Sequence, residues 1–281
     1  MKVAVFSCSK RHKQIKQPAF KDIHDKDVDF CIDLGDSYYF PNSSRKYKDK
    51  KFKDTLVDMD YVARLQRAEK YYAKLLPNMY SVFDDHCFGH NNSGSWLPSI
   101  FKAAAKKIKL DHFSAIPKVV KTRKGIYYDV DKEGILFLFL DVRTFREKYG
   151  RIWVWGRGFI RKKATLLGDT QKQWLSKMIK GYVGKIVICS GSTINGKDGW
   201  KNYPEDLHFL KSLLAGREAL FLSGDIHTNK VTKHDTFLEL TSSAVGRDNK
   251  NNYMIIDFKK DKVKFYGKDK LKKVEGLFSG L

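Results

Sequence analysis

Long apolar runs are missing from this sequence. A membrane-spanning helix needs about 20 consecutive apolar residues, and no apolar stretch in the 281 residues approaches that length. Residues 1–8 (MKVAVFSC) offer too short an apolar core for a secretory signal peptide. We therefore expect no membrane span and a cytoplasmic location.

Cysteine is scarce, and two kinds of short motif are absent. The four cysteines form no CxxC pair, and three of them lie in or beside apolar strand-like runs. This pattern is typical of reduced intracellular thiols rather than of a disulfide framework. The chain also has no GxxxxGKS/T and no GxGxxG motif, so neither a P-loop nor a Rossmann-type nucleotide site is supported.

A linker rich in proline, glycine and serine is also missing, and the chain has no internal repeat. A length of 281 residues is enough for one large domain or two small ones. Because nothing divides the chain, we expect residues 1–281 to form a single domain. The hydrophobic content of 42% is ample for a packed core.

Acidic side chains are outnumbered by basic ones. The sequence has 32 Asp and Glu against 54 Lys and Arg, which gives a formal net charge of +22. Such a charge attracts anions, including nucleic acids, other polyanions, phosphorylated small molecules and acidic membrane surfaces. A soluble, lysine-rich surface would have the same composition, so the charge alone does not choose between these interpretations.

Residues 30–40 (FCIDLGDSYYF) carry the first sign of a site. Residues 30–34 are mostly apolar and predict a short buried strand. Gly35 allows a sharp turn, which places Asp36 at the carboxyl end of the strand, where open α/β sheets bind their ligands. Tyr39 is close enough to share a centre with Asp36. A lone Gly-Asp would indicate an ordinary solvated turn, but the same arrangement recurs along the chain.

The densest polar cluster is DDHCFGHNN, residues 84–92, which follows a predicted strand over residues 79–83. Two adjacent Asp side chains directed into one site would repel each other unless a cation lay between them. A polar loop with turn-forming Asn and Gly is the alternative. That alternative does not explain why a buried strand leads into the cluster, so we interpret it as functional.

Metal-type residues also follow two other predicted strands. Cys8 comes after the strand over residues 2–6, either as an inert buried thiol or as a thiolate ligand. Asp225 and His227 follow the strand over residues 218–222, and their i, i+2 spacing places both side chains on one face of an extended segment. Carboxylate and imidazole are ligands of first-row metals; the alternative is an Asp turn with a hydrogen-bonded His.

Arginine follows the apolar strand of a predicted hairpin, residues 126–130 and 134–142. Arg143 can bind a phosphate with its planar fork or can pair with Asp141 to hold the loop. Residues 149–163 mix tryptophan with arginine, which suits stacking on nucleic acid, but we prefer a hairpin packed on the sheet.

Periodicity predicts the remaining elements. Apolar residues at three- and four-residue steps predict one helix over residues 52–76, and another is expected over residues 96–110. Thr170 is the expected N-cap of a helix over residues 171–180. The strand-like runs FLELTSS, YMIIDF and KVKFYG predict a second, largely antiparallel sheet.

The order of these motifs resembles that of the PhoD-like metallophosphatases (alkaline phosphatase D family), within the calcineurin-like metallophosphoesterases. The matching pieces span residues 6 to about 244 and are FSCS, DLGDSYY, FDDHCFGHNN, LDVRTFR, LLGDTQKQWL, DGWKNYP, LSGDIH and LTSS. The resemblance implies an α/β (α+β) four-layer sandwich of two mixed β-sheets flanked by helices, with a two-metal site at the sheet edges.

The same resemblance implies roles for individual residues. Asp36 would bridge two divalent or trivalent metal ions. Cys8, Tyr39 and His227 would hold one of them, with Fe³⁺ favoured. Asp85 and Asp225 would hold the other, with Ca²⁺ favoured and Mn²⁺ or Zn²⁺ as alternatives. The expected contacts to the phosphate or the leaving oxygen are His86, Asn91, Asn92 and, more weakly, Arg143.

These observations predict a metallophosphoesterase that hydrolyses phosphomonoesters or phosphodiesters by attack of a metal-bound hydroxide. Two alternatives stay open at this point. The same chemistry could act on nucleic acid, with the basic surface following the backbone. The chain could also be a basic binding protein that has no catalytic turnover.

Overall fold

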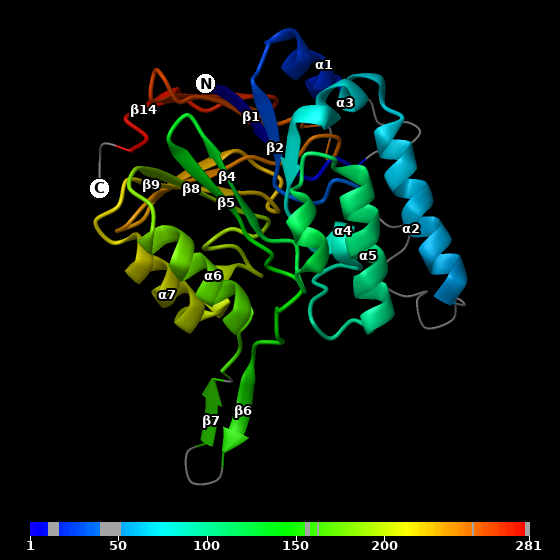
Figure 1. The fold of residues 1–281 in the computed structure, drawn as a ribbon, viewed down its shortest axis with the longest axis vertical. Coiled ribbons are helices and arrows are strands. Elements are labelled where there is room, and N and C mark those ends of the chain that lie inside the picture. The colour runs from blue at the N-terminus through cyan, green and yellow to red at the C-terminus, as the bar shows by residue number, and fades with distance from the viewer. Residues whose placement is uncertain (11–16, 40–51, 155–157, 162, 249, 279–281) are drawn as a thin grey trace.

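Two six-stranded mixed sheets form the centre of the molecule (Figure 1). The computed structural model describes residues 1–10, 17–39, 52–154, 158–161, 163–248 and 250–278. The first sheet has the order β14-β13-β12-β1-β2-β3. Its strands are β1 (Lys2–Phe6), β2 (Phe30–Asp33), β3 (Met79–Ser81), β12 (Tyr253–Asp257), β13 (Lys262–Tyr266) and β14 (Val274–Glu275).

The second sheet has the order β10-β11-β9-β8-β5-β4, and its four inner strands run parallel. Its strands are β4 (Tyr128–Lys132), β5 (Ile135–Phe139), β8 (Lys185–Ser190), β9 (Ala219–Ser223), β10 (Lys230–Lys233) and β11 (Leu238–Thr241). The predicted hairpin is confirmed, because β4 and β5 pair in antiparallel register with Lys132 opposite Ile135.

Alternating side chains of β5 show how the layers pack. Phe137 and Phe139 belong to the core between the sheets, while Leu136 and Leu138 belong to a separate core on the helical side. Across the sheet interface, the Phe137 ring lies 5.4 Å from that of Phe30 on β2. The second sheet is therefore buried on both faces, which explains why the β5 sequence is continuously apolar.

Helices cover both outer faces of the pair of sheets. On the side of the first sheet lie α1 (Pro18–Asp25), α2 (Phe52–Arg67), α3 (Lys70–Leu75), α4 (Asp85–Phe88) and α5 (Ser99–His112). On the side of the second sheet lie α6 (Gly168–Lys180) and α7 (Pro204–Leu214) (Figure 1). Three short 3₁₀ helices complete the described helices: η1 (Leu76–Asn78), η2 (Lys118–Thr122) and η3 (Trp200–Asn202). The predicted four-layer α/β sandwich is confirmed.

Three local expectations are wrong. The helix predicted over residues 52–76 is divided into α2 and α3, because Glu69 is extended and its side chain caps α3 by accepting a 2.5 Å bond from Tyr72 N. Thr170 is not an N-cap, since α6 already begins at Gly168. The strands predicted to form a separate antiparallel sheet belong to both main sheets, because β11 pairs with β9 in the second sheet while β12 pairs with β1 in the first.

The segment over residues 149–163 is a hairpin, but it does not pack on either main sheet. β6 (Arg151–Val154) and β7 (Gly158–Arg161) pair only with each other. Figure 1 shows this ribbon extending away from the body of the molecule. The expected packing on the sheet is therefore incorrect.

Two further expectations concern the whole chain. All four cysteines are buried and free, as the spacing predicted. No described helix combines the length and the apolar character that crossing a bilayer demands. The single domain and the cytoplasmic location stay predictions.

Candidate metal centre

The loops that follow β1, β2 and β9 meet at one edge of the two sheets. Cys8 N donates to Gly35 O at 3.1 Å, which joins the first two loops. Asp84 lies in the turn after β3. A Cβ on Gly35, whose φ is +92°, would lie 2.6 Å from the Asp84 Cβ, so only glycine allows the loop after β2 to approach that turn so closely. A Cβ on Gly224 would lie 2.7 Å from the Ser7 Oγ of the first sheet. The sheet packing thus brings the predicted residues to one place.

Asp36, Asp85 and His86 form the centre of this edge. One potential ligand atom from each lies within 4.8 Å of the others. The His86 N–H donates to Asp36 Oδ1 at 3.0 Å and to Asp85 Oδ1 at 2.9 Å. The backbone N–H of Asn92 donates to the other Asp85 oxygen at 2.6 Å. Backbone donors therefore fix the two carboxylates before any ligand binds.

Cys8 and Tyr39 complete one side of the centre. The Cys8 Sγ is 3.7 Å from Asp36 Oδ2, and the Tyr39 ring lies against the His86 ring with a centroid separation of 4.3 Å. The Tyr39 hydroxyl is buried beside the Cys8 thiol, and no nitrogen or oxygen of the described residues hydrogen-bonds to it. A buried hydroxyl whose polar neighbour is a thiol keeps the capacity to bind a water or an ion.

Asp225 and His227 approach from the second sheet. The Cys8 Sγ is 3.9 Å from the backbone oxygen of Asp225, and the charge of His227 acts on His86. His227 Nδ1 is 3.2 Å from Asp248 Oδ2, and its side chain keeps 24% of its surface exposed. The centre is therefore open to solvent on the side of His86, Asp225 and His227, which are all only partly buried.

The backbone adopts the left-handed region at several of these positions. Cys8, Asp36, Asn92, Asp225 and His227 have φ values between 52° and 70°. Such conformations are uncommon for residues other than glycine, and they cluster at binding and catalytic sites.

The two predicted asparagines differ in their placement. The Asn91 side chain is exposed, and its backbone oxygen lies 3.1 Å from His90 Nδ1. Asn92 contributes the backbone N–H that holds Asp85, whereas contacts of either amide side chain to a phosphate stay predictions.

Arg143 has a partner that sequence reasoning missed. Its guanidinium is fully buried and pairs with Asp84 through Nε at 2.7 Å and through Nη2. Nη2 also donates to Ser192 Oγ at 3.3 Å. The predicted alternative partner, Asp141, instead accepts the backbone N–H of Arg143 at 2.9 Å. A contact between Arg143 and a phosphate stays a prediction. No local signal pairs Arg143 with Asp84, which is 59 positions earlier.

Carboxylates accumulate at this edge, with Arg143 as a buried counter-charge. Burial, together with the nearby Asp84 and Asp85, raises the pKa of Asp225 to about 8. Burial and the same neighbours raise the pKa of Asp36 well above its usual range. Burial alone would also raise the pKa of Asp85, but Arg143, His86 and backbone donors outweigh it, so the pKa is lowered.

The donor set fits cationic ligands. Buried carboxylates that repel each other gain most from a cation between them, and the orphaned Tyr39 hydroxyl points to one more ligand. Burial raises the pKa of the Cys8 thiol and of the Tyr39 phenol, so a cation is needed to convert them to anionic donors. Burial lowers the pKa of His86 and of His227, so both imidazoles are neutral near pH 7, the form that coordinates metals.

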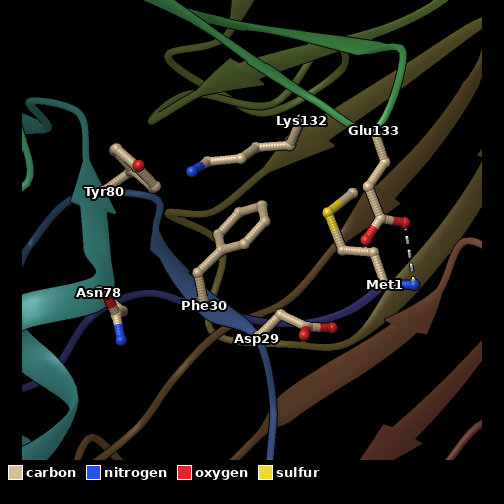
Figure 2. Close-up of a pocket in the computed structure, with 7 residues that line it drawn as sticks. All are labelled: Met1, Asp29, Phe30, Asn78, Tyr80, Lys132 and Glu133. Atoms are coloured by element: carbon tan, nitrogen blue, oxygen red, sulfur yellow. Dashed lines mark ion pairs between the residues drawn. The ribbon is translucent and has the colours of Figure 1, made fainter.

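A second hollow lies at the opposite edge of the sheets and carries none of the predicted residues. It measures about 220 Å³ and is lined by Met1, Asp29, Phe30, Asn78, Tyr80, Lys132 and Glu133. Figure 2 shows Glu133 turned to the amino group of Met1, at 3.5 Å. Its lining has no cysteine or histidine, and the group of potential metal ligands that the described residues bring together, Asp36, Asp85 and His86, lies at the first edge.

No family model matches the chain, and no curated protein matches its sequence. Among solved structures, PhoD matches 94% of this chain with a TM-score of 0.71 and 18% identity. This chain has a PhoD-like fold. It spans 65% of the length of the PhoD chain. The PhoD-like fold also resembles GAP50, described as the anchor in the inner membrane complex of Plasmodium, with a TM-score of 0.51, 12% identity and coverage of 98% of this chain and 88% of that one.

Proposed function

We propose that this protein is a metal-dependent phosphoester hydrolase. The observation that carries the proposal is the convergence of Asp36, Asp85 and His86, with potential ligand atoms within 4.8 Å of one another, at a solvent-open edge where Cys8 also reaches Asp36. The PhoD-like fold supports it at the level of architecture.

The residues present can hold a two-metal centre. We assign Cys8, Tyr39 and His227 to one ion, Asp85 and Asp225 to the other, and Asp36 to both. Fe³⁺ with Ca²⁺ suits these donors, with Mn²⁺ or Zn²⁺ as alternatives. When bound, such cations would supply Lewis-acid stabilisation of the phosphate oxygens and would lower the pKa of water.

The chain's own groups supply the rest of the chemistry. His86 reaches Asp36 and Asp85 through its backbone N–H, so its neutral ring takes part in neither bond and can hydrogen-bond an oxygen of the phosphate or of the leaving group. Arg143 fixes Asp84 beside Asp85 and adds positive charge behind the site. The Arg247 guanidinium lies 5.4 Å from the Tyr39 ring centroid and presents a cation near the opening. These cations favour an anionic substrate.

The test is Asp36→Asn, which keeps the size of the side chain and removes one anionic donor. We expect it to lose more than about 10²-fold in kcat/KM on an aryl phosphate and a bis-aryl phosphodiester, because removal of groups that only orient metal ligands already costs 10–100-fold. Elemental analysis should find less bound metal in this variant than in the wild type.

Asp60→Asn is the matched control, because Asp60 is an exposed carboxylate paired with Arg64 on α2. We expect it to keep wild-type activity and metal content. Full activity in Asp36→Asn would contradict the proposal. A wild-type protein that binds no metal and ignores chelators would instead favour the binding-protein alternative, and the likeness to GAP50 shows that this fold alone does not decide between the two.

The basic charge leaves a nucleic-acid substrate as a further prediction. A protein that neutralises several phosphates loses affinity steeply as salt rises, by about 10³–10⁵ between 50 and 200 mM for 6–10 contacts. If the basic surface binds along the phosphate backbone of a nucleic acid, we expect such a loss in the rate of oligonucleotide hydrolysis. Hydrolysis of the small ester should change little over the same range, and equal salt dependence of the two substrates would contradict the nuclease alternative.

A further inference from the structure

Among the described residues, one lysine lies inside the protein rather than on its surface. Lys109 is 0% exposed, and it shares the buried face of α5 with Ala105 and His112. Removing a charged group from water costs several kcal/mol unless its surroundings compensate. A lysine at an otherwise apolar helix position must therefore be explained by its contacts.

The ammonium group of Lys109 contacts both loops that carry the central ligands. Nζ donates to Ser37 Oγ at 2.7 Å and to Cys87 Sγ at 3.6 Å. Ser37 directly follows Asp36 in the sequence, and Cys87 directly follows His86. A single side chain on α5 thus connects the loop after β2 with the turn after β3.

The connection continues from Cys87 into the backbone of that turn. Asp84 N donates to Cys87 Sγ at 3.2 Å, and the thiol donates to Asp84 O at 3.3 Å. Because Asp85 is the next residue after Asp84, the position of Cys87 constrains the position of Asp85. Any shift of the thiol relative to Ser37 moves the Asp85 loop relative to the Asp36 loop.

The surroundings of Lys109 exclude water from this contact. Its Nζ lies 4.6 Å from the centroid of the Phe113 ring and 5.8 Å from that of Phe83, so aromatic faces rather than water complete its environment. Its charge also acts on Asp33, a fully buried carboxylate at the end of β2. Burial raises the pKa of Asp33 to about 6, against the lowering effect of Lys109.

We propose that Lys109 is a positioning residue of the metal centre, which sets the separation of the Asp36 and Asp85 carboxylates by holding their loops together. The inference rests on the proposed function, because it gives Lys109 a role toward bound metal ions. The two carboxylates share one donor, His86 N, at 3.0 and 2.9 Å. A small displacement of either loop would therefore separate the oxygens that share the ions.

The test is Lys109→Met, which keeps the length of the side chain and removes its charge and hydrogen bonds. The substitution leaves the buried Asp33 carboxylate without the cation that acts on it, and removal of one partner of a buried charge pair is destabilising. We expect the metal-free variant to unfold at a lower temperature than the wild type, so stability is measured separately from metal affinity. Its Kd for Mn²⁺, measured by calorimetry, should be 10–100-fold weaker, and the electron paramagnetic resonance spectrum of bound Mn²⁺ should change.

Ile108→Ala is the matched control on the same helix. Ile108 is partly buried and packs against the same core, but its side chain has no donor that could hold either ligand loop. We expect this variant to lose stability and to bind Mn²⁺ with wild-type affinity. Ser37→Ala removes the 2.7 Å bond from Lys109, together with the 3.5 Å contact of the Ser37 hydroxyl to Ser81 Oγ and its hydrogen bond to Asp33. It should therefore weaken Mn²⁺ binding, and the double variant with Lys109→Met should lose less than the sum of the two single losses.

The possible results separate this inference from the proposed function. Unchanged Mn²⁺ affinity and an unchanged spectrum in Lys109→Met overturn the role of Lys109 while leaving the hydrolase proposal intact. If Lys109→Met does not fold, wild-type Mn²⁺ affinity in Ser37→Ala overturns it equally. A wild-type protein that binds no Mn²⁺, Fe³⁺, Ca²⁺ or Zn²⁺ contradicts the proposed function itself.

Discussion

At the residue scale, the centre combines unfavourable backbone with repelling charges. Left-handed conformations such as those of Cys8, Asp36 and Asp225 cost of order 1–3 kcal/mol each and persist only where surrounding contacts impose them. The Asp84–Arg143 pair is among those contacts, because both side chains are fully buried and bonded to each other. The stability of the protein should therefore depend strongly on this pair.

Arg143→Met should destabilise the protein by about 3–5 kcal/mol, because it leaves the Asp84 carboxylate buried without its partner. Urea unfolding measures the loss. Lys163→Met is the control, since Lys163 and Glu205 form an exposed ion pair in which the side chains keep 89% and 62% of their surface. A pair of that kind contributes about 0–1 kcal/mol. Equal losses in both variants would show that the buried pair has no special role.

Local sequence could single out individual candidate ligands but could not identify the residues that pair with them. Asp36 and Asp225 could be proposed because each follows an apolar strand and a glycine. Arg143 could not be paired correctly, since Asp141 is nearer in sequence and satisfies backbone donors instead. Lys109 gave no signal at all, because a lysine on a helix is ordinarily a surface residue.

At the scale of elements, the boundaries follow packing rather than propensity. The residues of α2 and α3 have one continuous apolar period, but the two helices end and begin around an extended Glu69. Tyr72 of α3 then reaches His112 of α5, with the hydroxyl 3.0 Å from Nε2. Such a break depends on neighbouring helices, so sequence periodicity could predict the helical segment and not its division.

The buried His112 should make stability depend on pH. Burial, with the charges of Lys109 and Arg67, lowers the pKa of His112 well below its usual value of 6.5. Below pH 6.5 the unfolded chain therefore binds a proton that the folded protein does not, so stability falls as pH falls and this contribution is constant above pH 6.5.

Urea unfolding of the wild type and of His112→Gln between pH 5 and 8 measures this effect. We expect the unfolding free energy of the wild type, minus that of His112→Gln, to decrease below pH 6.5 by up to about 1.4 kcal/mol per pH unit. It should stay level above pH 6.5. A difference that is independent of pH would mean that His112 titrates normally in the folded protein.

At the scale of the whole molecule, metal binding and folding should be linked. The predicted ligands extend from Cys8 to His227 and come from both sheets, so an unfolded chain cannot present them together. A ligand that binds only the folded state, at 100 times its Kd, adds about 2.7 kcal/mol to the unfolding free energy. We expect Mn²⁺ to raise the unfolding temperature and a chelator to reverse the change. Asp36→Asn should respond less than the wild type.

The two sheets also differ in how the chain supplies them. Every strand of the second sheet comes from residues 128–241, whereas β1 pairs on one side with β2 and on the other with β12, about 250 positions later. During synthesis, the second sheet with α6 and α7 can assemble as soon as its own segment leaves the ribosome. One flank of β1 must wait until residues 253–257 have emerged. The first sheet is begun by β1, β2 and β3 but is thus expected to be the last to be completed in the nascent protein.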